Sequence, residues 1–139
     1  MRLILIICLC LVMPGIAHTQ TENDAERIVK RMIDTGFFEG HDQKVVGHLG
    51  DAGAVLVAKI LAGRDLTSTT IGNALVVIEE SFVDPGLVES AGDRPPRAAL
   101  LVLRYLDMST NDAELKKRIA DTRRYVQERY ASSLQEMKP

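Results

Sequence analysis

Two histidines and the acidic residues beside them are the first place in this sequence to look for chemistry. His41 and His48 are seven residues apart, with Asp42 and Asp51 close by. On one continuous helix the two imidazoles would share a face, but helical rise would separate them by about 10 Å. A single zinc ion needs its histidine nitrogens about 2 Å away. We therefore expect no metal site and no cofactor, and surface or capping roles for both histidines.

The sequence also lacks the patterns of nucleophilic and acid–base catalysis. It contains no G-x-S-x-G or S-x-x-K motif, no serine close to a histidine and no glycine-rich phosphate loop. Glu79 and Glu80 are adjacent acids, but successive residues on a helix diverge by about 100°, so they do not face one substrate together. We predict that the protein is not an enzyme and has no catalytic residues.

The first residues have the layout of a secretory signal peptide. Arg2 precedes an apolar run over residues 3–13, which a proline ends, and the small residues Gly15 and Ala17 match the pattern before a cleavage site. A membrane anchor would need about 20 apolar residues. We expect residues 1–17 to be removed after Ala17, which places the protein in the periplasm or outside the cell.

Both cysteines of the chain, Cys8 and Cys10, lie within this predicted signal peptide. The mature chain would then contain no disulfide and no thiolate ligand, and core packing alone would hold it together. An exported domain without cysteine is more typical of a bacterial periplasm than of a eukaryotic extracellular space. We expect one helical domain over residues 18–131, followed by a C-terminal tail over residues 132–139.

Apolar residues recur at helical spacing along most of the mature chain, and no stretch alternates with the period of a strand. The fold class is therefore predicted to be all-α. The expected helices span residues 23–35, 42–48, 51–62, 68–82, 93–107 and 111–131. Asp51 and Asp93 are expected to cap the helices that they begin, because a carboxylate accepts hydrogen bonds from first-turn amides.

The expected helix over residues 51–62 is apolar on nearly every side. After Asp51, its only charged residue is Lys59. A helix that is apolar all round must be covered all round. We therefore expect it to lie inside a stack, with amphipathic helices over residues 23–35 and 112–130 covering the two ends.

Two stretches of the sequence align with an offset of 42 residues. LGDAGAVLVAKILA, from Leu49, and AGDRPPRAALLVLR, from Ala91, each place Gly-Asp before small and then aliphatic residues. Each is followed by a second, more amphipathic helix, and a two-helix period of about 40 residues is typical of HEAT and armadillo arrays. Residues 49–84 and 91–130 resemble two HEAT repeats. The resemblance implies a short α–α superhelix of about five to six helices; a compact helical bundle is the alternative.

Charge is unevenly distributed along the chain. Residues 18–93 carry 6 basic and 13 acidic side chains, a balance of −7, whereas residues 94–139 carry 10 and 6, a balance of +4. The candidate partner-binding residues form an acidic cluster: Asp65, Glu79, Glu80, Asp84, Glu89 and Asp93. The candidate basic surface consists of Lys116, Lys117, Arg118, Arg123, Arg124 and Arg129. A solvated helix face with within-helix ion pairs is the alternative for the basic residues.

These features favour an exported, non-catalytic protein-binding module. Helical-repeat stacks present a concave surface to a partner, and the acidic cluster would favour a cationic one. An inhibitor or immunity-type protein that binds a secreted enzyme is the sharper form of this prediction. The alternatives are a self-associating structural envelope protein and a small-molecule carrier whose apolar pocket Val76, Leu101 and Tyr105 would line. A net charge of −2 and few aromatics argue against nucleic acid as a partner.

Overall fold

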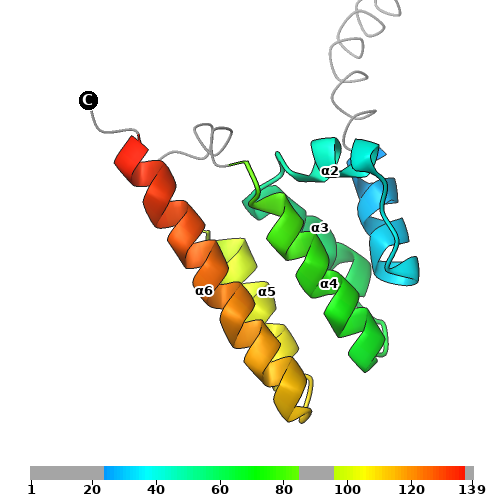
Figure 1. The fold of residues 1–139 in the computed structure, drawn as a ribbon. Helices are drawn as coiled ribbons and strands as arrows, with labels where there is room; N and C mark the ends of the chain where they lie inside the picture. Colours follow the sequence, from blue (N-terminus) through cyan, green and yellow to red (C-terminus); the bar gives the residue numbers. More distant parts are fainter. Residues whose placement is uncertain (1–23, 85–95, 137–139) are drawn as a thin grey trace, which may run out of the picture.

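A computed structural model of the chain describes residues 24–84 and 96–136, with side chains up to residue 131 (Figure 1). All regular secondary structure in these residues is helical, which confirms the predicted all-α class. The predicted signal peptide over residues 1–17 lies outside the described residues, as do Glu89 and Asp93.

A first helix over residues 24–35 precedes five others in the described part of the chain. Their bounds are α2 Gly40–Val46, α3 Asp51–Leu61, α4 Ser68–Ser81, α5 Arg97–Met108 and α6 Ala113–Glu136. These ranges follow the predicted ones to within a few residues at most ends. The start of α5 differs, because Pro96 is its N-cap residue and the helix begins at Arg97.

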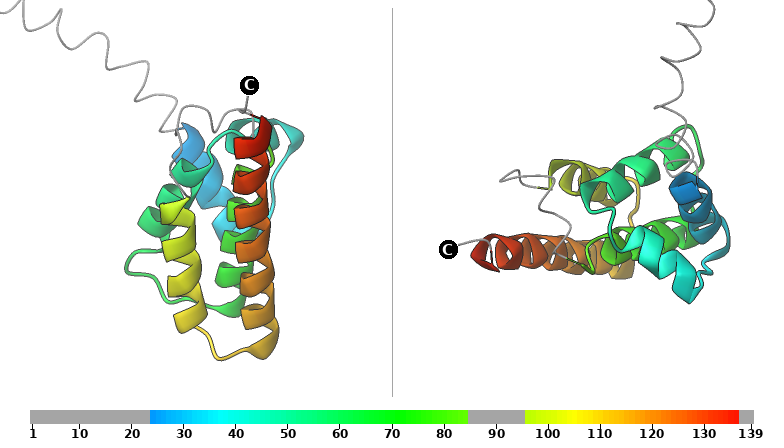
Figure 2. Two further views of the ribbon diagram at one scale, coloured as in Figure 1. Left: turned by 90° about the vertical axis from the view of Figure 1, so that its left-hand side faces the viewer. Right: turned by 90° about the horizontal axis from the view of Figure 1, so that it is seen from above.

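The helices are arranged in two layers (Figure 2). α3 packs beside α5 in one layer and α4 packs beside α6 in the other, while α3 contacts α4 and α5 contacts α6 between the layers. The first helix and α2 lie at the end of the molecule formed by α3 and α4 (Figure 1). The two predicted units are thus two helical hairpins packed side by side, an arrangement compatible with a repeat superhelix and with a compact bundle.

A single apolar core fills the space between the layers, and every helix contributes to it. Its large fully buried side chains include Met32, Val46, Leu61, Leu75, Ile78, Leu103, Leu106 and Ile119. Burying one such side chain stabilises the fold by about 1.5–3 kcal/mol. The core therefore holds the hairpins together without any covalent cross-link between the described residues.

The prediction that the helix over residues 51–62 is covered on every side is wrong. Leu56, Val57 and Leu61 are buried, but Val55 is 54% exposed and Ala52 also reaches solvent. α3 belongs to an outer layer, so it has neighbours beside and beneath it but no described helix above it (Figure 2). Small side chains can face solvent at little cost, so this side needs no cover.

The start of α3 lies against the end of α4. The backbone N–H of Gly50 donates to the carbonyl oxygen of Ser81 at 2.7 Å. Gly50 has φ +52°, in the left-handed region that glycine adopts most readily. Gly53 packs so closely that a Cβ there would lie 2.1 Å from Oγ of Ser81. The two helices of this hairpin therefore approach each other only because the residue at position 53 has no side chain.

The expectation that Asp51 caps its own helix is wrong. Its side-chain oxygens accept hydrogen bonds from the backbone N–H groups of Ala98 at 3.0 Å and Ala99 at 2.7 Å. These amides lie in the first turn of α5 and have no partner within that helix. A carboxylate at this position also interacts favourably with the helix dipole. Asp51 thus caps α5 and connects the two hairpins.

Replacing Gly53 with alanine tests this close approach. Gly53→Ala is expected to lower the free energy of unfolding by about 1–3 kcal/mol, because the new methyl group overpacks the contact with Ser81. Adding Ser81→Gly should restore part of the loss. Gly40→Ala is the matched control, since a Cβ at Gly40 meets nothing within 4 Å. Chemical denaturation measures all of these variants, and equal stability of Gly53→Ala and Gly40→Ala would contradict the packing.

Candidate functional site

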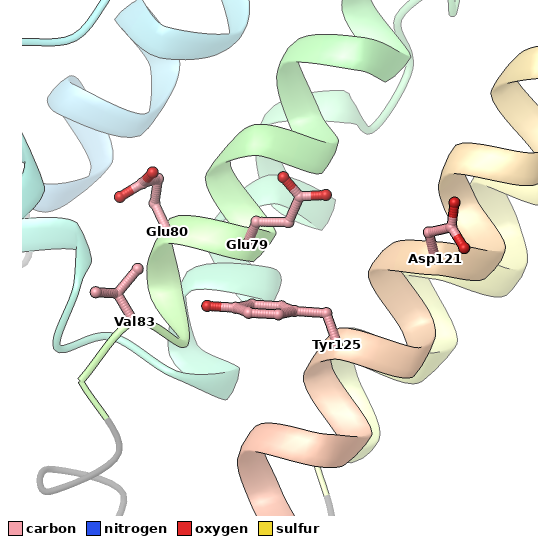
Figure 3. A pocket seen from close by; sticks show the side chains of 5 residues that line it. All are labelled: Glu79, Glu80, Val83, Asp121 and Tyr125. Carbon is pink, nitrogen blue, oxygen red and sulfur yellow. The ribbon is translucent and has the colours of Figure 1, made fainter.

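An open groove of about 390 Å³ lies on the surface between α4 and α6 (Figure 3). It is lined by Glu79, Glu80, Val83, Asp121 and Tyr125. We call it the acidic groove. Its α4 side is the C-terminal end of that helix and Val83, two residues beyond it, and its α6 side is the middle of the last helix. It therefore lies where the second helices of the two hairpins run beside each other.

A buried threonine joins α4 to α6 beside the groove. The hydroxyl of Thr122 donates to Oε1 of Glu79 at 2.6 Å and lies 3.0 Å from the carbonyl oxygen of Arg118. Hydrogen bonds to a carboxylate are shorter and stronger than those between neutral groups. This bond fixes the side chain of Glu79 at the edge of the groove.

The surroundings of Glu80 disfavour the ionised form of its carboxyl group. Burial raises the pKa of Glu80, and the negative charge of Glu79 raises it further. Within the described part of the chain, the Glu80 side chain has no hydrogen bond or ion pair. A cation placed near it would favour its ionised form. The groove therefore contains negative charge that the described residues do not neutralise fully.

The ring of Tyr125 provides an apolar surface beside these carboxylates. The ring is half-buried and extends from α6 toward the end of α4, between Glu79 and Val83 (Figure 3). The guanidinium of Arg129 lies 5.3 Å from the ring centroid. This distance is within the range of a cation–π interaction. The ring is therefore already in contact with a guanidinium group of the chain itself.

Asp121 is the third carboxylate of the groove. It forms an ion pair with Arg124 at 2.7 Å, and both side chains are exposed. An exposed pair of this kind contributes only about 0.2–1 kcal/mol, so it exchanges readily for another partner. Three carboxylates beside an aromatic ring suit a lysine or arginine side chain, which can stack on the ring and donate charge-assisted hydrogen bonds to the carboxylates.

The structure brings only part of the predicted acidic cluster to this groove. Glu79 and Glu80 line it. Asp65 precedes Ser68, the first residue of α4, which is about 16 Å from Glu79 along the helix. Asp84 lies 3.5 Å from Nδ1 of His48, in the turn before α3. Asp121 was not among the predicted residues and takes part in the groove instead.

The predicted basic residues all belong to α6 but surround it instead of forming one patch. Lys116 faces α5, where its ammonium donates to the carbonyl oxygen of Asp107 at 3.0 Å. Arg118 faces α4, since a Cβ built on Gly72 would lie 3.5 Å from its guanidinium. The others are exposed or half-buried at further positions around the helix: Lys117, Arg123, Arg124 and Arg129.

The predicted lining of a carrier pocket is also divided between surfaces. Val76 is half-buried on α4, whereas Leu101 is 66% and Tyr105 is 48% exposed on α5. These three residues therefore do not enclose one apolar cavity. α5 turns the side with Leu101 and Tyr105 away from the core, and the small-molecule carrier stays a prediction.

The described residues contain no group of three or more histidine, cysteine or acidic side chains that could hold a metal ion. In the same part of the chain, no helix has the length and apolar character needed to cross a bilayer. Comparison with protein-family models, with curated proteins and with solved structures finds no match to this chain. The geometry of the acidic groove is therefore the basis for a proposed function.

Replacing Glu80 with glutamine tests the electrostatics of the groove. A raised pKa means that the folded protein binds this proton more tightly than the unfolded chain, so ionised Glu80 destabilises the fold at neutral pH. Glu80→Gln is expected to raise the melting temperature at pH 7. The gain should disappear below the ordinary glutamate pKa of about 4.3, where both states are protonated.

Thermal denaturation between pH 3 and 7 measures this difference. The matched control is Asp65→Asn, which removes one exposed carboxylate at the other end of α4. A Glu80→Gln variant that is less stable than the wild type at neutral pH would contradict the described environment of Glu80.

Proposed function

We propose that the chain is an exported, non-catalytic protein-binding module, in which the acidic groove holds a cationic segment of a partner protein. The observation that carries the proposal is that Glu79, Glu80 and Asp121 line one groove together with Tyr125. A lysine or arginine of the partner would lie over the ring among these carboxylates. Complementary charge of this kind increases the rate of encounter and gives specificity.

The position of the acids on their helix supports the same proposal. Glu79 and Glu80 belong to the last turn of α4, which contains no basic residue. The C-terminal end of a helix carries partial negative charge and is stabilised by cations, so two carboxylates are unfavourable there. A cationic side chain from a partner would offset the repulsion between these charges. Binding would therefore relieve an unfavourable interaction of the free protein.

The predicted signal peptide supports one kind of partner. A chain with a signal peptide over residues 1–17 meets secreted or periplasmic proteins, because export removes it from cytoplasmic ones. We favour a secreted enzyme that the chain binds and blocks, in the manner of an inhibitor or immunity-type protein. Such a role needs a complementary surface and no catalytic residues of its own.

Binding of a short basic peptide tests the proposal. A dye-labelled arginine octapeptide is expected to bind the wild-type protein, with an affinity that falls as salt screens the charges. Glu80→Lys should weaken this binding by about tenfold, equivalent to about 1.4 kcal/mol. Fluorescence anisotropy measures the dissociation constants at low and high salt.

The matched control is Asp65→Lys, which changes the net charge equally at the opposite end of α4. It should change the affinity by less than about twofold, because a charge more than a Debye length away is largely screened. Equal loss of binding in both variants would show that the peptide responds to net charge alone, and would contradict a specific groove.

A further inference from the structure

The outer side of α5 presents large apolar side chains to solvent. Leu101, Tyr105 and Met108 are 66%, 48% and 70% exposed. Their spacing of four and then three residues places them on one side of the helix. α5 buries the opposite side in the core, where Ala99 and Leu103 are fully covered. Contiguous exposed apolar residues of this kind mark interaction sites on soluble proteins.

Basic residues flank these side chains. Arg97 and Arg104 are exposed on the same side of α5, and Val55 is an exposed apolar residue of neighbouring α3. The two described acids of these helices do not neutralise the positive charge of the arginines. Asp51 caps α5, and Asp107 lies toward Lys116 of α6. We call this surface, made of Arg97, Leu101, Arg104, Tyr105 and Met108, the α5 stripe. It is apolar and positively charged.

We propose that the α5 stripe of one copy of the chain docks into the acidic groove of a second copy. The stripe belongs to the layer of α3 and α5, and the groove to the layer of α4 and α6, so one molecule can present both at once (Figure 2). The two arginines complement the three carboxylates. The apolar side chains of the stripe complement Val83, which is 48% exposed, and Tyr125.

This inference rests on the proposed function in one respect, since the same groove accepts the cationic side chains. A second copy of the chain is the occupant of the groove. The two surfaces differ, so each contact leaves a free stripe on one copy and a free groove on the other, and further copies add head to tail. A partner segment in the groove would displace the neighbouring copy. Self-association would then withhold the groove until a partner competes for it.

The test uses two charge-reversal variants with intact complementary surfaces. The stripe variant, Arg97→Glu with Arg104→Glu, retains the groove; the groove variant, Glu80→Lys with Asp121→Lys, retains the stripe. Analytical ultracentrifugation measures the mass of each variant, of their equal mixture and of the wild type. At low salt, the average mass of the wild-type protein should increase at least about twofold as its concentration rises, because association follows mass action. At high salt, the mass should return to that of the monomer.

Each variant alone should remain a monomer, and the equal mixture should form a one-to-one dimer that cannot grow further. Circular dichroism of both variants checks that they remain folded. A wild-type monomer at every concentration would overturn the inference, as would a mixture that stays monomeric. A monomer whose stripe binds anionic phospholipid vesicles would also overturn it in favour of a lipid surface. If the arginine octapeptide still binds in any of these cases, the proposed function stands without the self-association.

Discussion

The fold depends on the first turn of α3, where three helices meet within four residues. The N–H of Gly50 bonds to the end of α4, the bare backbone of Gly53 lets the same helix approach, and Asp51 caps the start of α5. The first two contacts hold α3 against α4 within one hairpin, and the third sets the two hairpins against each other in the layer of α3 and α5. In the other layer, Thr122 bonds to Glu79. The relative placement of α4 and α6, and therefore the shape of the acidic groove, follows from these contacts.

The groove differs electrostatically from the first half of the structure, where acids are matched by cations. Hydrogen bonds from Lys30 and Arg64 lower the pKa of Asp34. Burial opposes ionisation of Asp42, but the amide of Glu39 and the ion pair with Arg31 together hold its pKa below the ordinary value. The acids in these contacts contribute to stability as anions.

Glu80 shows the reverse, because burial and a neighbouring carboxylate raise its pKa. An arrangement that destabilises the free protein but would be relieved by a bound cation is better suited to recognition than to folding. The α5 stripe adds an apolar and basic surface to the same molecule. We propose on these grounds that another protein, or another copy, brings its positive charge to the groove.

The helices and their pairing into hairpins follow from local patterns, because apolar spacing, glycines and prolines act within a few residues of one another. Two predictions failed where local pattern and packing diverge. Alanines counted as apolar on every side of α3, yet Ala52 faces solvent without any cover. Asp51 has the position of a local cap, but its partners are the amides of a helix 47 residues further along the chain.

Only part of the groove can be predicted from the sequence. The charge of Glu79 and Glu80 marks them as candidates, and Asp121 and Tyr125 lie four residues apart, on one side of a predicted helix. Their meeting depends on the packing of α4 against α6, which no local spacing encodes. Exposure of Leu101 and Met108 was equally unreadable, because apolar residues at helical spacing indicate a buried face as readily as a binding face.

Amide hydrogen exchange at Ala98 and Ala99 tests most directly whether Asp51 connects the two hairpins. First-turn amides of a helix exchange rapidly unless a partner protects them. If Asp51 connects the hairpins, both amides exchange as slowly as core amides such as that of Leu103, and Asp51→Ala makes them exchange rapidly. Rapid exchange at both positions in the wild-type protein, unchanged by Asp51→Ala, would contradict this connection.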